Sequence, residues 1–207
     1  MKKVPVSIRI IYILASIVYY LSALVCSLGV VLVFAILFGF LTDDLQLHIN
    51  MPVEVNFLEV GDAFFNGQKM EIEIVEAIGK VHLIDTPSSL VRRLAIPLLI
   101  VIPVLFWLVY LFHRFMRNVS EGRIFEKRNF ELLRMLGYSL MGFWLIMVVY
   151  MQILKYTLVS NFTFEQIEIT NNSRWFGGVF IGALFMLVLS HIFFKGSELE
   201  EENELTI

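Results

Sequence analysis

Four long apolar runs constrain the fold of this 207-residue chain more than any other feature of its sequence. They occupy residues 10–40, 94–112, 136–154 and 175–194. A helix needs about 20 mainly apolar residues to cross a hydrocarbon core of roughly 30 Å, and backbone groups cannot stay unpaired in lipid. The 58% hydrophobic content agrees with this interpretation. We therefore predict a mainly α membrane protein built on a four-transmembrane-helix bundle.

The first run follows Lys2, Lys3 and Arg9, as the apolar part of a signal peptide would. However, a signal peptide has an apolar region of only about 7–15 residues. Because this run is far longer, we expect it to be a retained membrane anchor.

The distribution of Lys and Arg predicts the orientation of the four helices. Ten of these residues lie in the N-terminal segment, in the link between the second and third runs, and in the tail, whereas six lie on the other side. In membrane proteins the cytoplasmic segments carry the excess of Lys and Arg. We therefore expect a multi-pass protein of the inner membrane with both termini in the cytoplasm.

Segment 42–93 alternates apolar and polar residues, which is typical of half-buried strands. Gly61 and the Asn66-Gly67 pair are expected to form turns. A shorter alternation follows in segment 156–174, with an expected bulge at Glu165-Gln166. The alternating apolar positions are Leu45, Leu47, Ile49, Val53, Val55, Phe57, Ile72, Ile74, Val81, Leu83, Phe162, Phe164, Ile167 and Ile169. These two loops predict a small extracytoplasmic antiparallel β subdomain that packs on the helix ends or on another subunit.

The cytoplasmic link, residues 113–135, contains a turn at Ser120-Glu121-Gly122 and then an amphipathic helix that starts at Glu126. The apolar stripe of this helix is formed by Phe130, Leu133 and Gly137. Its polar face is formed by Lys127, Glu131 and Arg134. The spacing is that of a helix with one apolar side. We expect this helix to run along the lipid surface into the third span.

The tail, residues 195–207, carries five acids and one base. Such a run is typical of a solvated, disordered end. Leu199, Leu205 and Ile207 are apolar, however, and a purely solubilising tail has no use for an apolar terminus. Both interpretations, a solvated end and a short binding motif, stay open at this point.

Two of these cytoplasmic segments carry a resemblance to a known family. They are Glu121-Gly122-Arg123-Ile124-Phe125 with Asn129, Leu133, Arg134 and Gly137, and the closing segment 196–207. Both resemble the matching segments of a bacterial four-span family, domain of unknown function 2975. Its members commonly have Ser or Thr, a natural helix N-cap, where this chain has Glu126. Because the family is often encoded beside a small helix-turn-helix regulator, the resemblance implies a membrane partner for a transcription factor.

No sequence pattern indicates an enzyme, a cofactor or a metal site. The four histidines, which are too scattered to form a zinc site on one helix, are His48, His82, His113 and His191. No ionisable residue lies at the centre of a span, which argues against an ion-coupled transporter. Gly177, Gly178 and Gly182 are small residues suited to close helix packing within the chain.

These interpretations divide the chain into eight segments. They are the N-terminus and first span (1–41), the β-rich loop (42–93), the second span (94–112), the basic link (113–135), the third span (136–155), the second loop (156–174), the fourth span (175–194) and the acidic tail (195–207).

The leading hypothesis is a non-enzymatic bacterial membrane sensor that binds or sequesters a small cytoplasmic helix-turn-helix regulator. The residues expected to bind it are Gly122, Phe125, Lys127, Arg128, Arg134, Leu199, Glu201, Glu202, Leu205, Thr206 and Ile207. The lipid bilayer and a second copy of the chain (a homo-oligomer) are the other expected partners, with no direct contact to nucleic acid. The alternative is a small channel, transporter or accessory subunit of a membrane complex, which ion flux in liposomes would reveal.

Overall fold

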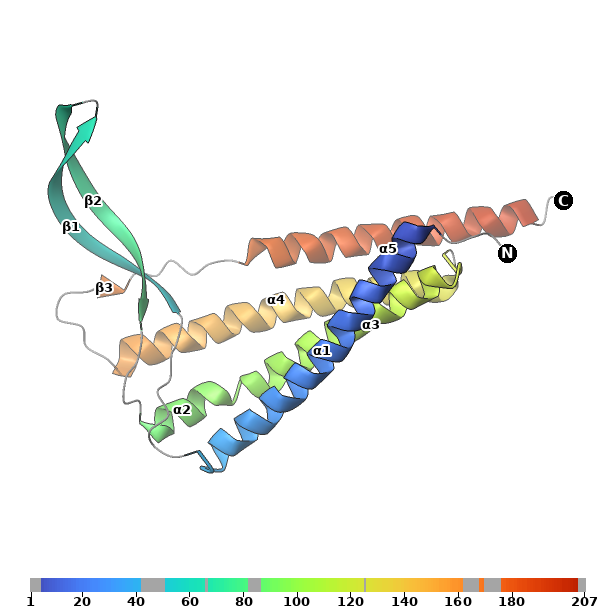
Figure 1. The fold of residues 1–207 in the computed structure, drawn as a ribbon, viewed down its shortest axis with the longest axis horizontal. Coiled ribbons are helices and arrows are strands. Elements are labelled where there is room, and N and C mark those ends of the chain that lie inside the picture. The colour runs from blue at the N-terminus through green and yellow to red at the C-terminus, as the bar shows by residue number, and fades with distance from the viewer. Residues whose placement is uncertain are drawn as a thin grey trace.

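The computed structural model describes residues 5–41, 51–65, 67–81, 87–124, 126–161, 168–169 and 176–204. Helices dominate the described part, and a long hairpin extends from one end of them (Figure 1). In chain order the elements are α1 (Val6–Leu37), β1 (Met51–Phe65), β2 (Gln68–Val81), α2 (Ser88–Ala95), α3 (Leu98–Ser120), α4 (Lys127–Asn161), β3 (Glu168–Ile169) and α5 (Gly177–Glu204).

Four helical stretches are long and apolar enough to cross a membrane, and each overlaps one of the predicted spans. They are Val6–Leu37, Ser88–Ser120, Lys127–Thr157 and Gly177–Leu199. The start of α1, the end of α5 and the α3–α4 turn lie at one end of the helices, which we call the termini end, and the hairpin lies at the other (Figure 1). The prediction of a multi-pass membrane protein with four helices is confirmed.

The four long helices pack as an open row rather than as a closed bundle. Neighbours in the sequence are neighbours in space, with α1 packed along α3, α3 along α4, and α4 along α5. A central core joins α3 to α4 through Leu108, Leu111, Leu132 and Leu136. The buried residues of α1 are Ala15 and Val33, and most of its other apolar side chains are exposed. In a lipid bilayer such apolar surface needs no protein cover, which explains why an open row is compatible with a folded chain.

The start of the second span differs from the predicted one. The structure shows a short helix, α2, that ends at Ala95 and a turn at Ile96–Pro97 before α3 begins. Pro97 has no N–H to donate to a carbonyl one turn back, so the helix breaks there. As a result Arg92 and Arg93, expected in a loop, lie in the last turn of α2.

The cytoplasmic link and the tail were both expected to be distinct from the spans beside them. Instead, α4 is one continuous helix from Lys127, so the predicted amphipathic segment is the first part of the helix that contains the third span. Likewise, α5 continues through the acidic residues to Glu204. The tail, for which a disordered end was one of the two interpretations, is therefore helical up to that residue, because Leu and Glu are good helix formers. Residues 205–207 lie outside the described part.

The strands differ from the predicted β subdomain. β1 and β2 form a long antiparallel hairpin that stands away from the helices (Figure 1), and β3 adds two residues beside β1. Gly67 has a φ of 81° at the hairpin turn, as expected, but Gly61 pairs with Ile72 inside the strands and is not a turn. Because a single layer has no second layer against which to bury a face, the described strands do not support a compact subdomain. The strand expected at 45–49 and the bulge at Glu165-Gln166 lie outside the described residues.

Candidate functional site

The turn between α3 and α4 is fixed by backbone hydrogen bonds at the termini end. Gly122 has a φ of 83°, a left-handed conformation that glycine adopts without strain and that commonly ends a helix. Its N–H donates to the backbone carbonyl of Val119 at 3.1 Å, and the backbone N–H of Arg123 donates to the backbone carbonyl of Asn118 at 3.1 Å. The predicted turn is confirmed, and its left-handed backbone explains a glycine at position 122.

Two buried asparagines hold the turn together from inside. Asn118 on α3 and Asn129 on α4 are 5% and 0% exposed. Asn118 Nδ2 donates to Asn129 Oδ1 at 2.8 Å. Asn129 Nδ2 in turn donates to the carbonyls of Arg123 and Ile124, the latter at 3.0 Å. Because a buried amide is costly unless its hydrogen bonds are made, this network fixes the conformation of the turn.

Ion pairs surround the outside of the same turn. Arg117 Nε lies 3.1 Å from Glu121 Oε1, and Arg123 pairs with both Glu121 and Glu126. The Arg117 hydrogen bond, followed by the one from Arg123, holds the pKa of Glu121 below its usual value. Glu126 thus contributes a partner for Arg123 immediately before α4. Exposed pairs of this kind contribute little stability, so the buried asparagines matter more.

Close packing of α4 on α5 continues from the turn into the membrane-spanning part. The Ser190 hydroxyl donates to the Phe130 carbonyl at 2.9 Å, and the Phe130 and Phe194 rings meet edge to face at 5.1 Å. At Gly137 an added Cβ would lie 2.7 Å from Leu187 Cδ2 and 3.2 Å from the Ala183 carbonyl. Gly137 is therefore the residue that permits the close approach of the two helices.

The glycines of α5 do not have the packing role that the sequence suggested. A Cβ added at Gly177, Gly178 or Gly182 would meet nothing within 4 Å. The prediction was wrong because it considered one helix and could not show which face of α5 meets α4.

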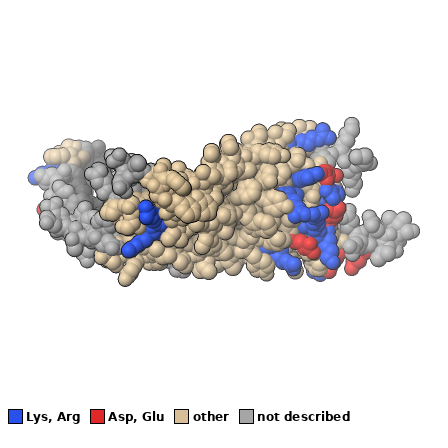
Figure 2. Space-filling view, turned by 90° about the horizontal axis from the view of Figure 1, so that it is seen from below, with Lys and Arg blue, Asp and Glu red and all other residues tan. Residues whose placement is uncertain are grey.

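The predicted partner-binding residues fall into three groups. Gly122, Lys127 and Arg128 are exposed at or just after the turn, while Leu199 and Glu202 are exposed on the extension of α5. Arg134 lies apart from both groups, in a pocket between α4 and α5. The side chains not described are Phe125, Glu201, Leu205, Thr206 and Ile207. Figure 2 shows basic and acidic side chains gathered at the termini end, beyond a wide uncharged region.

A contact between α1 and α3 was not foreseen from the sequence. The ring of His113 stacks on Tyr19 at 4.6 Å and on Tyr12 at 5.7 Å, and its Nε2 lies 3.2 Å from Ser16 Oγ. Tyr12, Ser16 and Tyr19 recur at helical spacing along α1, a polar stripe in an apolar run that could have indicated a partner on another helix. His113 is therefore a packing residue between two helices. No cluster of side chains suited to a metal ion occurs in the described ranges.

Comparison with known proteins identifies the family of the chain. The profile of the family described as "Protein of unknown function (DUF2975)" matches residues 71–207, about two thirds of the chain. The chain belongs to this family. No curated protein and no solved structure matches it. The matched region includes the α3–α4 turn, Gly137 and the whole of α5. Gly122, Asn129 and Gly137, which were among the residues that carried the resemblance, therefore have the structural roles described above.

Proposed function

We propose that this DUF2975 protein is a non-enzymatic regulator in the inner membrane of a bacterium, which holds a small cytoplasmic helix-turn-helix transcription regulator. The observation that carries the proposal is the unbroken course of α5 from its apolar part to Glu204. Residues 195–204, which we call the α5 extension, would be about 15 Å long at 1.5 Å per residue. Figure 1 shows the extension reaching past the α3–α4 turn.

The chemistry of the α5 extension fits a basic protein. Five glutamates lie between Glu198 and Glu204, and Leu199 is 59% exposed among them. DNA-binding proteins have a basic surface, and complementary charge speeds association and selects partners. The exposed Leu199 adds an apolar contact. The protein's own net charge of -3 argues against a direct contact with DNA.

The α3–α4 turn supplies the second part of the proposed docking surface. Lys127 and Arg128 are exposed in the first turn of α4, next to the rigid network around Asn129. A rigid site loses less conformational entropy when a partner binds. We therefore place the regulator between the basic start of α4 and the acidic α5 extension.

The orientation is tested by labelling single cysteines in intact cells. Cys26 is the only cysteine, so Cys26→Ser gives a background without thiols. In this background Gln68→Cys, at the hairpin turn, is expected to react with a membrane-impermeant maleimide, whereas Lys127→Cys reacts only after the membrane is opened. Both positions are exposed, so burial does not explain a difference. The reverse labelling pattern would show that the protein has the opposite orientation in the membrane.

Partner binding is tested by co-purification with the proposed small helix-turn-helix regulator. Removal of residues 197–207 is expected to abolish co-purification, because the acidic surface and Leu199 are lost together. Leu199→Asp is the matched variant that leaves the helix and its acids in place, and it is expected to weaken binding. Undiminished co-purification by the truncated chain would contradict docking on the α5 extension.

The alternative, a small channel or an accessory subunit, makes a different prediction. The described helices form an open row that encloses no central path in a single copy. We therefore expect no ion flux above background in liposomes that contain only this protein. Flux that depends on protein density would favour a channel formed by several copies.

A further inference from the structure

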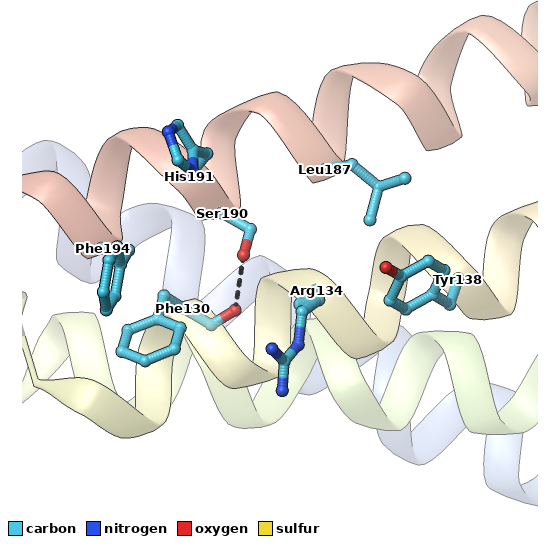
Figure 3. Close-up of a pocket in the computed structure, with 7 residues that line it drawn as sticks. All are labelled: Phe130, Arg134, Tyr138, Leu187, Ser190, His191 and Phe194. Carbon is cyan, nitrogen blue, oxygen red and sulfur yellow. Dashed lines mark hydrogen bonds between the residues drawn. The ribbon is translucent and has the colours of Figure 1, made fainter.

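A pocket between α4 and α5 lies beside the proposed docking surface, and it is lined by both apolar and polar side chains. Its cavity is about 300 Å³, the lower end of the range for small-molecule sites. Figure 3 shows that α4 and α5 each provide one wall. The lining residues are Phe130, Arg134, Tyr138, Leu187, Ser190, His191 and Phe194. Arg134, Tyr138 and His191 are exposed, so the pocket opens to the side of the helix pair, where lipid lies.

The side chains of Arg134 and His191 in this pocket have hydrogen-bond donors that no described residue of the protein accepts. Within the described part of the chain, no hydrogen bond or ion pair engages the side chain of Arg134 or His191. Other arginines at the termini end differ, since Arg117 and Arg123 are paired with carboxylates. None of the seven lining residues carries a carboxylate. An arginine with free donors and no neighbouring acid in its pocket selects an anion, and its planar fork suits a phosphate.

The apolar walls of the pocket and its position across the bilayer favour an anion that carries a hydrocarbon chain. Phe130, Leu187 and Phe194 provide apolar surface beside Arg134. Arg134 is the last charged residue of α4 before the uncharged stretch of residues 135–154, so it lies at the boundary between the charged and the uncharged part of this helix. A phospholipid headgroup occupies this depth in a bilayer. Basic pockets between membrane helices bind anionic lipid headgroups.

We propose that this pocket binds the phosphate of an anionic phospholipid, with Arg134 as the main donor. The apolar walls hold the upper part of an acyl chain. Neither the α5 extension nor a partner protein is needed, so the proposal does not rest on the proposed function.

The test measures lipid retained by the purified full-length protein. Protein taken from vesicles of equal parts phosphatidylglycerol and phosphatidylcholine with matched chains is analysed by native mass spectrometry. The wild type is expected to retain phosphatidylglycerol in preference. Arg134→Gln is expected to lower that preference roughly tenfold, because a hydrogen-bonded charge is lost. Arg9→Gln, an exposed arginine on α1 away from the pocket, is expected to leave it unchanged.

Two results would overturn the proposal. Equal retention of both lipids by the wild type, or an equal loss in Arg9→Gln and Arg134→Gln, would show that no specific pocket exists. Displacement of the retained phosphatidylglycerol by inorganic phosphate would show that the pocket holds the free anion and not a lipid. Because Arg134 is exposed, its replacement should not unfold the protein, and an unchanged melting temperature checks this.

Discussion

Gly137→Ala is expected to destabilise the protein by about 1–3 kcal/mol, the usual cost of forcing extra atoms into packed helices. The added Cβ would lie 2.7 Å from Leu187 Cδ2 and 3.2 Å from the backbone carbonyl of Ala183. The Leu187 side chain can turn aside, but the carbonyl moves only if α5 moves. The measurement is the free energy of unfolding in detergent, followed by tryptophan fluorescence.

Gly142→Ala is the matched control on the same helix. A Cβ at Gly142 meets nothing within 4 Å, so this change removes only the conformational cost of a helical glycine. It is expected to stabilise the protein by about 0.5–1 kcal/mol. Equal effects of the two substitutions would contradict the close approach of α4 and α5 at Gly137.

Asn129→Ala is expected to cost about 1–3 kcal/mol, because it leaves a buried amide without a partner. Asn118 would keep its Nδ2 donor in a site that is 5% exposed, and the carbonyl of Ile124 would lose its hydrogen bond. The loss should appear as a lower melting temperature and as faster proteolysis in the α3–α4 turn.

A double-mutant cycle separates the asparagine pair from the rest of the turn. Asn118→Ala alone should also destabilise, and the double variant should cost less than the sum of the two single changes, because the pair shares one hydrogen bond. Strict additivity would mean that the two asparagines act independently.

The sequence was sufficient for the parts of the fold that depend on local chemistry. Uninterrupted apolar runs in lipid can only be helices, so the four spans were predictable. Gly122 and Gly67 occupy left-handed turns in the structure, where glycine is favoured. The stripe that contains Phe130 and Leu133 is buried, as helical spacing predicted.

The parts that depend on contacts between distant segments were not predictable. Nothing in one helix shows which face meets its neighbour, so Gly137 was only one member of a stripe and the α5 glycines were misassigned. The hydrogen bond between Asn118 and Asn129 joins two different helices, so neither helix alone could reveal it. The same is true of the pocket at Arg134, whose other wall comes from α5. For the same reason, the sequence did not show that the ring of His113 on α3 stacks on Tyr19 of α1.

The central claim is that the α5 extension keeps a DNA-binding regulator at the membrane. The most direct measurement is the position of the fluorescently labelled regulator in cells that express either the full chain or the chain ending at Gly196, at equal membrane levels. We expect fluorescence along the membrane with the full chain and over the nucleoid with the truncated chain. The same distribution with both chains, whether at the membrane or over the nucleoid, would contradict this claim.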